Sequence, residues 1–153
     1  IVIGGAAGAF PPMIGWAAVT GSIGVESLAL FVLIFVWTPP HFWSLALYRS
    51  DDYARAGVPM LPVVRGAAVT KKHIIAYTIL LLPLSVLPTV LGFAGWIYGS
   101  AAILLGLVFI AAALAVWFDA TDRAPKRMFG FSILYLFGLF AMLIADRAPG
   151  LAG

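Results

Sequence analysis

The chain has 153 residues, of which 63% are hydrophobic and only 10% are charged. A soluble domain is typically about 45–50% apolar and about 25% charged, so this composition indicates an integral membrane protein. The small net charge of +3 argues against nucleic-acid binding, and the absence of cysteine excludes disulfides, thiolate metal sites and CxxCH heme attachment.

The first predicted element is the apolar segment 1–20, whose helix is expected to be broken by the double proline Pro11-Pro12. The freed backbone groups are either covered by packing or line a cavity. Gly4 and Gly8 have the GxxxG spacing that lets a second helix approach closely. The segment begins without methionine and without the basic region of a signal peptide. We therefore expect the chain to be the carboxy-terminal part of a longer protein.

The second predicted span, 27–48, is long enough at about 1.5 Å per residue to cross a hydrocarbon core about 30 Å thick. Pro39 and Pro40 are predicted to break it near its middle, where the freed carbonyls must face protein or water. His41 follows at once, and an ionisable residue within a span is a functional candidate. Packing against a neighbouring helix explains this histidine equally well, so ligand, base and packing all stay open.

A long hydrophilic segment, 49–73, leaves this span and is followed by apolar runs at 74–92, 97–118 and 128–145. The loop 119–127 joins the last two runs. We expect an all-α integral membrane bundle with about four full spans plus the broken leading helix, forming a single membrane domain over the whole chain.

Nearly all basic residues fall in the segment 49–73 and the loop 119–127. These eight of the nine are Arg49, Arg55, Arg65, Lys71, Lys72, Arg123, Lys126 and Arg127. The ninth, Arg147, lies near the end of the chain, on the other side of the membrane. By the positive-inside rule we expect both basic connections to face the cytoplasm.

Residues 38–66 read TPPHFWSLALYRSDDYARAGVPMLPVVRG and hold the densest ionic chemistry in the chain. Gly57 is a natural C-cap and Pro59 prevents the helix from resuming, so Asp51 and Asp52 are expected on a short helical extension above the bilayer. A carboxylate pair with arginine and lysine nearby suits a Mg²⁺–diphosphate, because Mg²⁺ takes one or two carboxylates and arginine binds phosphate oxygens in a fork. The alternative is a solvated loop with local salt bridges.

Aromatic residues lead from the span into the same segment. They are Trp37, Phe42, Trp43, Tyr48 and Tyr53. Together with the double proline and the histidine, they indicate an apolar pocket with an ionic entrance, as a lipid-tailed diphosphate requires.

The 38–66 string resembles the second aspartate motif of the heme O synthase family, within the UbiA superfamily of membrane prenyltransferases. The opening GGAAGAFPPMIGWAAVTG is similar to the preceding helix of that family. The resemblance is close over residues 1–73 and looser in the later spans. It implies a UbiA-like helical bundle around a central cavity, with two acidic motifs facing each other at the cytoplasmic side. The first of these, NxxxDxxxD, is absent from this chain, so the chain by itself is expected to be inactive.

The resemblance implies transfer of farnesyl from farnesyl diphosphate to a vinyl group of heme b, giving heme O and diphosphate, in the cytoplasmic (inner) membrane. Asp52, followed by Tyr53, matches the motif's aspartate best, and Asp51 directly precedes it. The expected catalytic residues are Asp52, Asp51 and Tyr53, with both aspartates as Mg²⁺ ligands. The expected substrate-binding residues are Arg49, Arg55, Arg65, Lys71, Lys72, His41, Tyr48 and Trp43. The implied partners are farnesyl diphosphate, heme b, the lipid bilayer and a downstream heme A synthase.

Three other functions stay open. A relative in the same superfamily would prenylate a quinone or chlorophyll precursor, although the TPPHFW and YRSDDYARAGVPMLP strings look more like the heme enzyme. A transporter or channel subunit also has broken helices and a histidine within a span, but this chain shows no inverted repeat. The third alternative is a purely structural membrane subunit, in which the charged segment would have no function.

Overall fold

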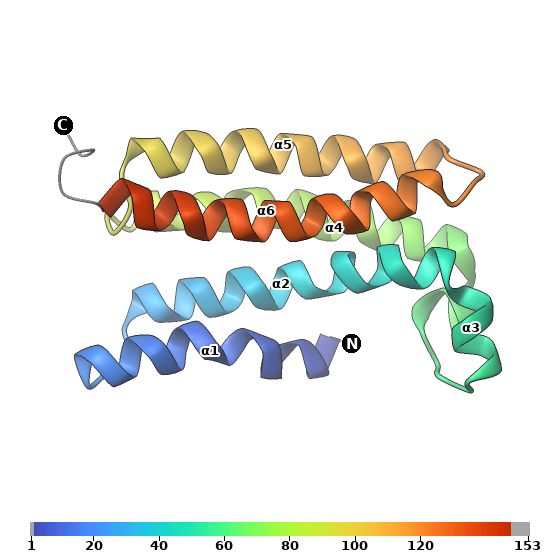
Figure 1. Ribbon diagram of the computed structural model, residues 1–153, viewed down its shortest axis with the longest axis horizontal. Coiled ribbons are helices and arrows are strands. Elements are labelled where there is room, and N and C mark those ends of the chain that lie inside the picture. Colours follow the sequence, from blue (N-terminus) through green and yellow to red (C-terminus); the bar gives the residue numbers. More distant parts are fainter. Residues whose placement is uncertain (1, 148–153) are drawn as a thin grey trace.

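The computed structural model describes residues 2–147, and this part of the chain forms helices and turns without a strand. The helices are α1 (Val2–Thr20), α2 (Val25–Tyr48), α3 (Ser50–Arg55), α4 (Leu61–Val90), α5 (Trp96–Phe118) and α6 (Arg123–Arg147). Figure 1 shows the longer helices lying along one axis, with α3 set at one end of the bundle. The helix α2 packs against α1, α4 and α6, and α5 packs against α4 and α6.

Four helices, α2, α4, α5 and α6, are long and apolar enough to cross a membrane. Large apolar side chains cover their outer surface: Leu104 is 65% exposed, and Phe137 and Ile144 are exposed to a similar degree. A soluble protein would bury such residues, whereas a membrane protein turns them toward lipid. The predicted all-α, multi-pass membrane fold with four full spans is therefore confirmed.

The core lies between α2, α4, α5 and α6. Phe109, Tyr98 and Tyr135 are almost completely buried there. Phe109 packs against Tyr135 with ring centroids 4.9 Å apart, which joins α5 to α6. The helix α1 lies outside this core and packs on α2.

The two basic connections lie at the same end of the bundle, as predicted (Figure 1). Lys71 Nζ donates a hydrogen bond to the Asp119 carbonyl oxygen at 2.6 Å, which ties the beginning of α4 to the α5–α6 connection. We call this the basic end of the molecule. The α1–α2 and α4–α5 turns lie at the opposite end.

The double prolines do not break their helices, and this corrects the sequence-based expectation. Both α1 and α2 continue through them as single helices. A proline removes one backbone donor, but the remaining hydrogen bonds of a long helix in a membrane hold it together. Pro39 and Pro40 are both buried, so their neighbourhood faces protein, as expected for freed carbonyls within a span.

The predicted loops are shorter than expected because helices begin inside them. The helix α4 starts at Leu61, not at residue 74. Pro62 lies in its first turn, where a backbone N–H would have no partner within the helix, so the missing N–H of proline costs nothing. A break at Gly66 (φ 81°) divides it, so the basic residues after Gly66 lie on a helix. Likewise, α6 begins at Arg123, within the predicted loop 119–127.

Two predicted elements extend beyond the described residues. The first span was expected to begin at Ile1 and the membrane domain to reach residue 153, and residues 1 and 148–153 lie outside what the structure describes.

Candidate functional site

The aspartate pair lies on α3, which begins after a change of backbone direction at Arg49 (φ −118°, ψ 19°). Asp52 accepts hydrogen bonds from two guanidinium groups. Arg49 Nη1 lies 3.1 Å from Oδ2, and Arg55 Nη2 lies 2.9 Å from Oδ1. Each of the three side chains is more than half exposed, so solvent weakens the pairs and they contribute little to stability. The Asp51 carboxylate forms no ion pair within residues 2–147.

A glycine turn fixes the end of α3, as predicted for Gly57. Its φ of +67° is a left-handed conformation that favours glycine. The Gly57 N–H donates to the Ala54 carbonyl at 3.1 Å and the Val58 N–H donates to the Tyr53 carbonyl at 3.0 Å. This pair of bonds is the Schellman motif, which satisfies the last carbonyls of a helix. The turn directs the chain back toward α4.

Two cations converge on one aromatic ring at the basic end. Arg49 Cζ lies 5.9 Å from the centre of the Tyr48 ring, and Lys126 Nζ, from α6, lies 5.5 Å from the same centre. The end of α2, the short helix α3 and the beginning of α6 therefore meet here. We call Tyr48, Arg49, Asp52, Arg55 and Lys126 the ionic mouth.

The connection between α5 and α6 holds Lys126 in this position. Asp119 accepts hydrogen bonds from the Ala124 N–H at 2.6 Å and from the N–H and hydroxyl of Thr121, both at 2.7 Å. These hydrogen bonds, that of Ala124 first, lower the pKa of Asp119 below its ordinary value. The carboxylate thus caps the first turn of α6.

A row of aromatic rings leads from the ionic mouth down the seam between α2 and α6. Trp37 stacks on His41 with ring centroids 4.3 Å apart, and His41 stacks on Phe129 at 4.6 Å. Phe129 meets Tyr48 edge-on at 6.3 Å. We call Trp37, His41, Phe129 and Tyr48 the aromatic ladder. From Tyr48 to Trp37 it follows eleven residues of α2, about 16 Å at 1.5 Å per residue.

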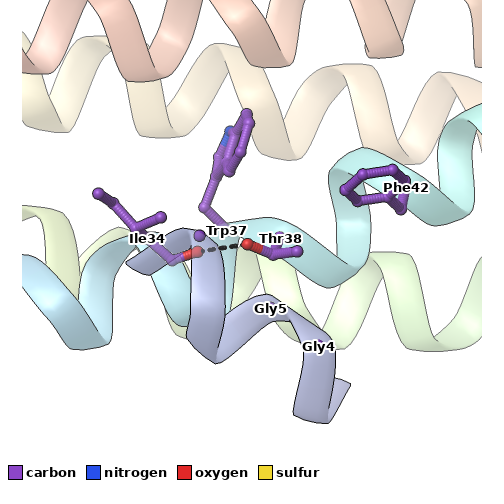
Figure 2. A pocket seen from close by; sticks show the side chains of 7 residues that line it. Gly4, Gly5, Ile34, Trp37, Thr38 and Phe42 are labelled. Carbon is purple, nitrogen blue, oxygen red and sulfur yellow. Dashed lines mark hydrogen bonds between the residues drawn. The ribbon is translucent and has the colours of Figure 1, made fainter. Parts of the chain in front are cut away.

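An apolar pocket of about 420 Å³ lies between α1 and α2 near the lower end of the ladder. Its wall on α2 is formed by Ile34, Trp37, Thr38 and Phe42, and Figure 2 shows Gly4 and Gly5 on the facing helix. The Thr38 hydroxyl is satisfied within α2, because it donates to the Ile34 carbonyl at 2.8 Å. The pocket therefore offers an apolar surface.

The close approach of α1 to α2 depends on Gly5, whereas the helix contact predicted for Gly4 and Gly8 does not occur within residues 2–147. A Cβ added at Gly5 would lie 3.0 Å from Thr38 Cγ2, whereas one at Gly4 or Gly8 would meet nothing. Within residues 2–147 no helix packs against that pair. Both glycines line the apolar pocket instead.

His41 is packed, which is one of the alternatives left open by the sequence. Its ring lies between Trp37 and Phe129, and its Nδ1 lies 2.6 Å from Ser132 Oγ of α6. The other ring nitrogen, Nε2, forms no hydrogen bond within the described part of the chain.

Several predicted site residues lie away from the ionic mouth. Lys71 is held by the Asp119 carbonyl. Trp43 is only 5% exposed and packs edge-on against Tyr77 at 5.1 Å. The side chains of Arg65 and Lys72 are exposed on α4 and form no ion pair within residues 2–147. Tyr53, in contrast, directly follows Asp52 on α3 beside the ionic mouth and is partly buried.

Three residues of α6 belong to this site and were missed by sequence reasoning. Lys126 was counted only as a loop charge, and Phe129 and Ser132 were not singled out. Nothing local in the sequence marks them, because their importance comes from the packing of α6 on α2, some 80 to 95 positions earlier in the chain.

The two carboxylates suit a metal ion whose remaining ligands are supplied by a bound substrate. No group of three histidine, cysteine or acidic residues within the described chain could hold a metal ion by itself. Asp51 and Asp52 offer at most two carboxylates, beside exposed cations. That arrangement fits Mg²⁺, which keeps several waters and is completed by phosphate oxygens.

The bundle and its site define a multi-pass membrane protein with an ionic mouth above an apolar pocket. Residues 1–143 match the model of the UbiA prenyltransferase family, and the chain belongs to that family. No solved structure matches the chain.

The chain is similar to curated proteins named protoheme IX farnesyltransferase. The chain is 56% identical over 157 residues to a protoheme IX farnesyltransferase of Parvibaculum lavamentivorans, covering 100% of this chain and 49% of the relative. It is 57% identical over 155 residues to the protein of that name from a Methylobacterium species (99% and 49%) and 54% identical over 158 residues to that of Novosphingobium aromaticivorans (100% and 52%). The chain thus spans about half the length of the curated relatives it matches.

Proposed function

We propose that the protein is a protoheme IX farnesyltransferase, which transfers the farnesyl group of farnesyl diphosphate to a vinyl group of heme b and forms heme O. The observation that carries this proposal is the identity of 54–57% to relatives of that name over nearly the whole chain. The ionic mouth, joined by the aromatic ladder to an apolar pocket, supports it, because farnesyl diphosphate has an anionic head and an apolar tail.

The diphosphate is assigned to the ionic mouth. Arg49, Arg55 and Lys126 supply donors for the phosphate oxygens, and guanidinium groups bind such oxygens in bidentate pairs. Asp52, with Asp51 beside it, would hold Mg²⁺. When bound, Mg²⁺ neutralises charge that develops on the leaving diphosphate. The exposed pairs of Asp52 with arginine can exchange partners readily, because each contributes little to stability.

The reaction breaks the bond between farnesyl C1 and the diphosphate oxygen, whose electron pair leaves with the diphosphate. The π electrons of the heme vinyl group form the new carbon–carbon bond to C1. A water molecule then adds to the cation beside the porphyrin and loses a proton, which leaves a hydroxyl group. The ring faces of Tyr48 and Tyr53 stabilise positive charge at C1 by cation–π attraction, worth up to about 2 kcal/mol when water is excluded.

The farnesyl tail and the porphyrin are assigned to two neighbouring surfaces of α2. The farnesyl tail extends into the pocket formed by Ile34, Thr38 and Phe42. The porphyrin lies against the α2–α6 seam, along Trp37 and His41. Exclusion of water from these surfaces protects the allylic cation from premature capture.

We place the protein in the cytoplasmic membrane with the basic end toward the cytoplasm. Eight of the nine basic residues lie at or near that end, and cytoplasmic connections carry such an excess. The product would be consumed by an enzyme that oxidises heme O, such as a heme A synthase.

A competition between acceptors tests this proposal. Membranes that contain the complete protein receive radiolabelled farnesyl diphosphate and Mg²⁺, with heme b and an aromatic quinone precursor present together. The proposal predicts that label enters the porphyrin. Label in the quinone precursor alone would show that this compound, and not heme b, is the acceptor. No transfer to either compound would overturn the prenyltransferase function.

A further inference from the structure

Ser132 makes three contacts that fix Trp37 and His41 in the α2–α6 seam. Its side chain is completely buried. Its carbonyl accepts a hydrogen bond from Trp37 Nε1 at 2.9 Å. Its Oγ lies 2.6 Å from the Phe129 carbonyl oxygen and 2.6 Å from His41 Nδ1. A single residue of α6 thus orients both rings.

The two contacts of the hydroxyl determine which nitrogen of His41 carries the proton. A serine hydroxyl has one hydrogen, and a carbonyl oxygen can only accept, so the hydrogen must point to the Phe129 carbonyl. Ser132 Oγ is then an acceptor toward His41, and Nδ1 must be the donor. In neutral imidazole the second nitrogen is then unprotonated. Nε2 of His41 therefore carries a free lone pair.

We infer that Ser132 is a positioning residue that holds His41 in the Nδ1–H form, so that Nε2 is presented as a ligand to the iron of the heme substrate. The identity of this substrate rests on the proposed function. Histidines that bind metals commonly donate their other N–H to an oxygen, which fixes the ring and makes the ligand more basic. The Ser132–His41 pair has this arrangement.

The place of His41 along α2 favours an iron ligand over a base for the reacting carbon. It lies seven residues from Tyr48, about 10 Å below the ionic mouth at 1.5 Å per residue. The allylic carbon is attached to the diphosphate and so stays near the mouth. The vinyl groups of heme lie at the edge of the macrocycle, away from the iron. Iron bound at His41 would therefore allow a vinyl edge to reach the mouth.

The His41 ring is held in one orientation by its neighbours. Trp37 and Phe129 stack on its two faces with interplanar angles of 18° and 22°, and Phe42 lies nearly perpendicular to it with ring centroids 5.2 Å apart. A ligand can therefore approach the ring only along its edge. Ser132 occupies the Nδ1 edge, and Nε2 points away from it because the two nitrogens lie on different sides of the ring.

The protonation of His41 can be measured without substrate. Nitrogen NMR of the complete protein with ¹⁵N-labelled histidine distinguishes a protonated from an unprotonated ring nitrogen, and the signal that disappears in His41→Gln identifies the residue. We expect Nδ1–H with a bare Nε2 in the wild type, and a shift toward Nε2–H in Ser132→Ala. An Nε2–H form in the wild type, or an unchanged spectrum in Ser132→Ala, would overturn the inference.

The second measurement is binding of ferric heme b, followed through its Soret band, against binding of iron-free protoporphyrin IX. Ser132→Ala should weaken heme binding about 10-fold or more and shift the Soret band, as loss of such a partner does at metal sites, while the affinity for the iron-free porphyrin stays constant. The matched control is Ser85→Ala. Ser85 is equally buried and donates to the Leu82 carbonyl at 2.7 Å, but it forms no hydrogen bond with a histidine in the described chain.

The two measurements separate this inference from the proposed function. Equal weakening of heme and iron-free porphyrin binding in Ser132→Ala would show a packing role and overturn iron ligation. A wild-type protein that has the Nδ1–H form and binds neither porphyrin would contradict the proposed heme substrate, and with it the ligand role, while the assignment of the tautomer would stand.

Discussion

Asp52 is the residue on which the chemistry of the ionic mouth depends. In the structure each of its carboxylate oxygens accepts from a different arginine, Arg49 or Arg55. Both arginines come from the same short stretch of chain, so a carboxylate and two phosphate-binding groups stay within reach of one another. Its neighbour Asp51 points a carboxylate into solvent without an ion pair among the described residues. These features make Asp52 the better anchor and Asp51 the available second ligand.

Asp52→Asn should abolish farnesyl transfer while the protein remains folded. The amide cannot replace a carboxylate as a ligand to Mg²⁺, and we expect kcat/KM to fall by about 100-fold or more, as when a group that stabilises transition-state charge is lost. Turnover by purified protein measures this effect. Asp122→Asn is the control, since Asp122 is an exposed acid at the same end of the molecule. Near-normal turnover by Asp52→Asn would refute its role.

Residues of the mouth and ladder differ in how far the sequence could predict them. The aspartates, Arg49 and Tyr48 lie within one continuous stretch, so local spacing was enough to group them. The contact between His41 and Ser132 joins positions 91 residues apart, and only the packing of α6 on α2 creates it. Trp43 was expected to bind substrate because it is an aromatic residue beside the motif, and the structure places it in the core.

The α5–α6 connection shows how an element end is fixed by one carboxylate. Asp119 accepts from Ala124 and Thr121, and its own carbonyl accepts from Lys71. The connection therefore joins the beginnings of α4 and α6, and it sets the position of Lys126 in the ionic mouth. Acidic side chains are favourable at helix N-termini because they satisfy free N–H groups there.

The lowered pKa of Asp119 predicts a dependence of stability on pH. Hydrogen bonds from Ala124 and Thr121 favour the ionised form in the folded protein. This stabilisation is complete above the ordinary aspartate pKa of 3.8 and is lost as the pH falls through the lowered value. In thermal unfolding experiments the difference between wild type and Asp119→Asn should therefore be constant near neutral pH and shrink in acid. A difference that is independent of pH would contradict this role.

The other end of the bundle depends on a second carboxylate. Asp146, near the end of α6, is only 6% exposed and accepts hydrogen bonds from the Gly95 and Tyr98 N–H groups. These donors belong to the beginning of α5, so α6 caps its neighbour from the side. A Cβ at Gly95 would lie 2.9 Å from this carboxylate, which explains why glycine occupies the position.

Asp146→Ala should destabilise the protein by about 1–3 kcal/mol, because it leaves the N–H groups of Gly95 and the buried Tyr98 without this acceptor. Equilibrium unfolding in detergent measures the change in the free energy of unfolding. Asp122→Ala removes an exposed carboxylate and should stay within about 0.5 kcal/mol of the wild type. Equal stability of the two variants would show that the cap is unimportant.

The helices themselves could be predicted largely from hydrophobic length. Both ends of α2 and α5 lie within two residues of the predicted spans. The beginnings of α4 and α6 could not be predicted in this way. The short apolar start of α4, LPVV, is separated from its long apolar run by basic residues, and the first turn of α6 is itself polar. The effect of the double prolines was also overestimated. Packing in the bundle keeps a helix intact even where a proline removes a backbone hydrogen bond.

The arrangement of the whole molecule predicts its orientation in the membrane. The Ser50 position lies at the basic end and Ser22 lies in the turn between α1 and α2 at the opposite end. In a complete protein without other cysteines, Ser50→Cys should be protected from an impermeant thiol reagent in intact cells, and Ser22→Cys should be labelled. The reverse pattern would place the ionic mouth outside the cytoplasm.

The most direct test of the proposed reaction is the mass of the porphyrin product. Membranes with the complete protein receive heme b, farnesyl diphosphate and Mg²⁺, and the porphyrins are extracted for mass spectrometry. We predict a heme whose mass has increased by one farnesyl group and one water, and we predict its loss when Mg²⁺ is chelated or when Asp52 is replaced by asparagine. Unchanged heme b under all conditions, or the same product in the presence of the chelator and in Asp52→Asn, would contradict farnesyl transfer at the ionic mouth.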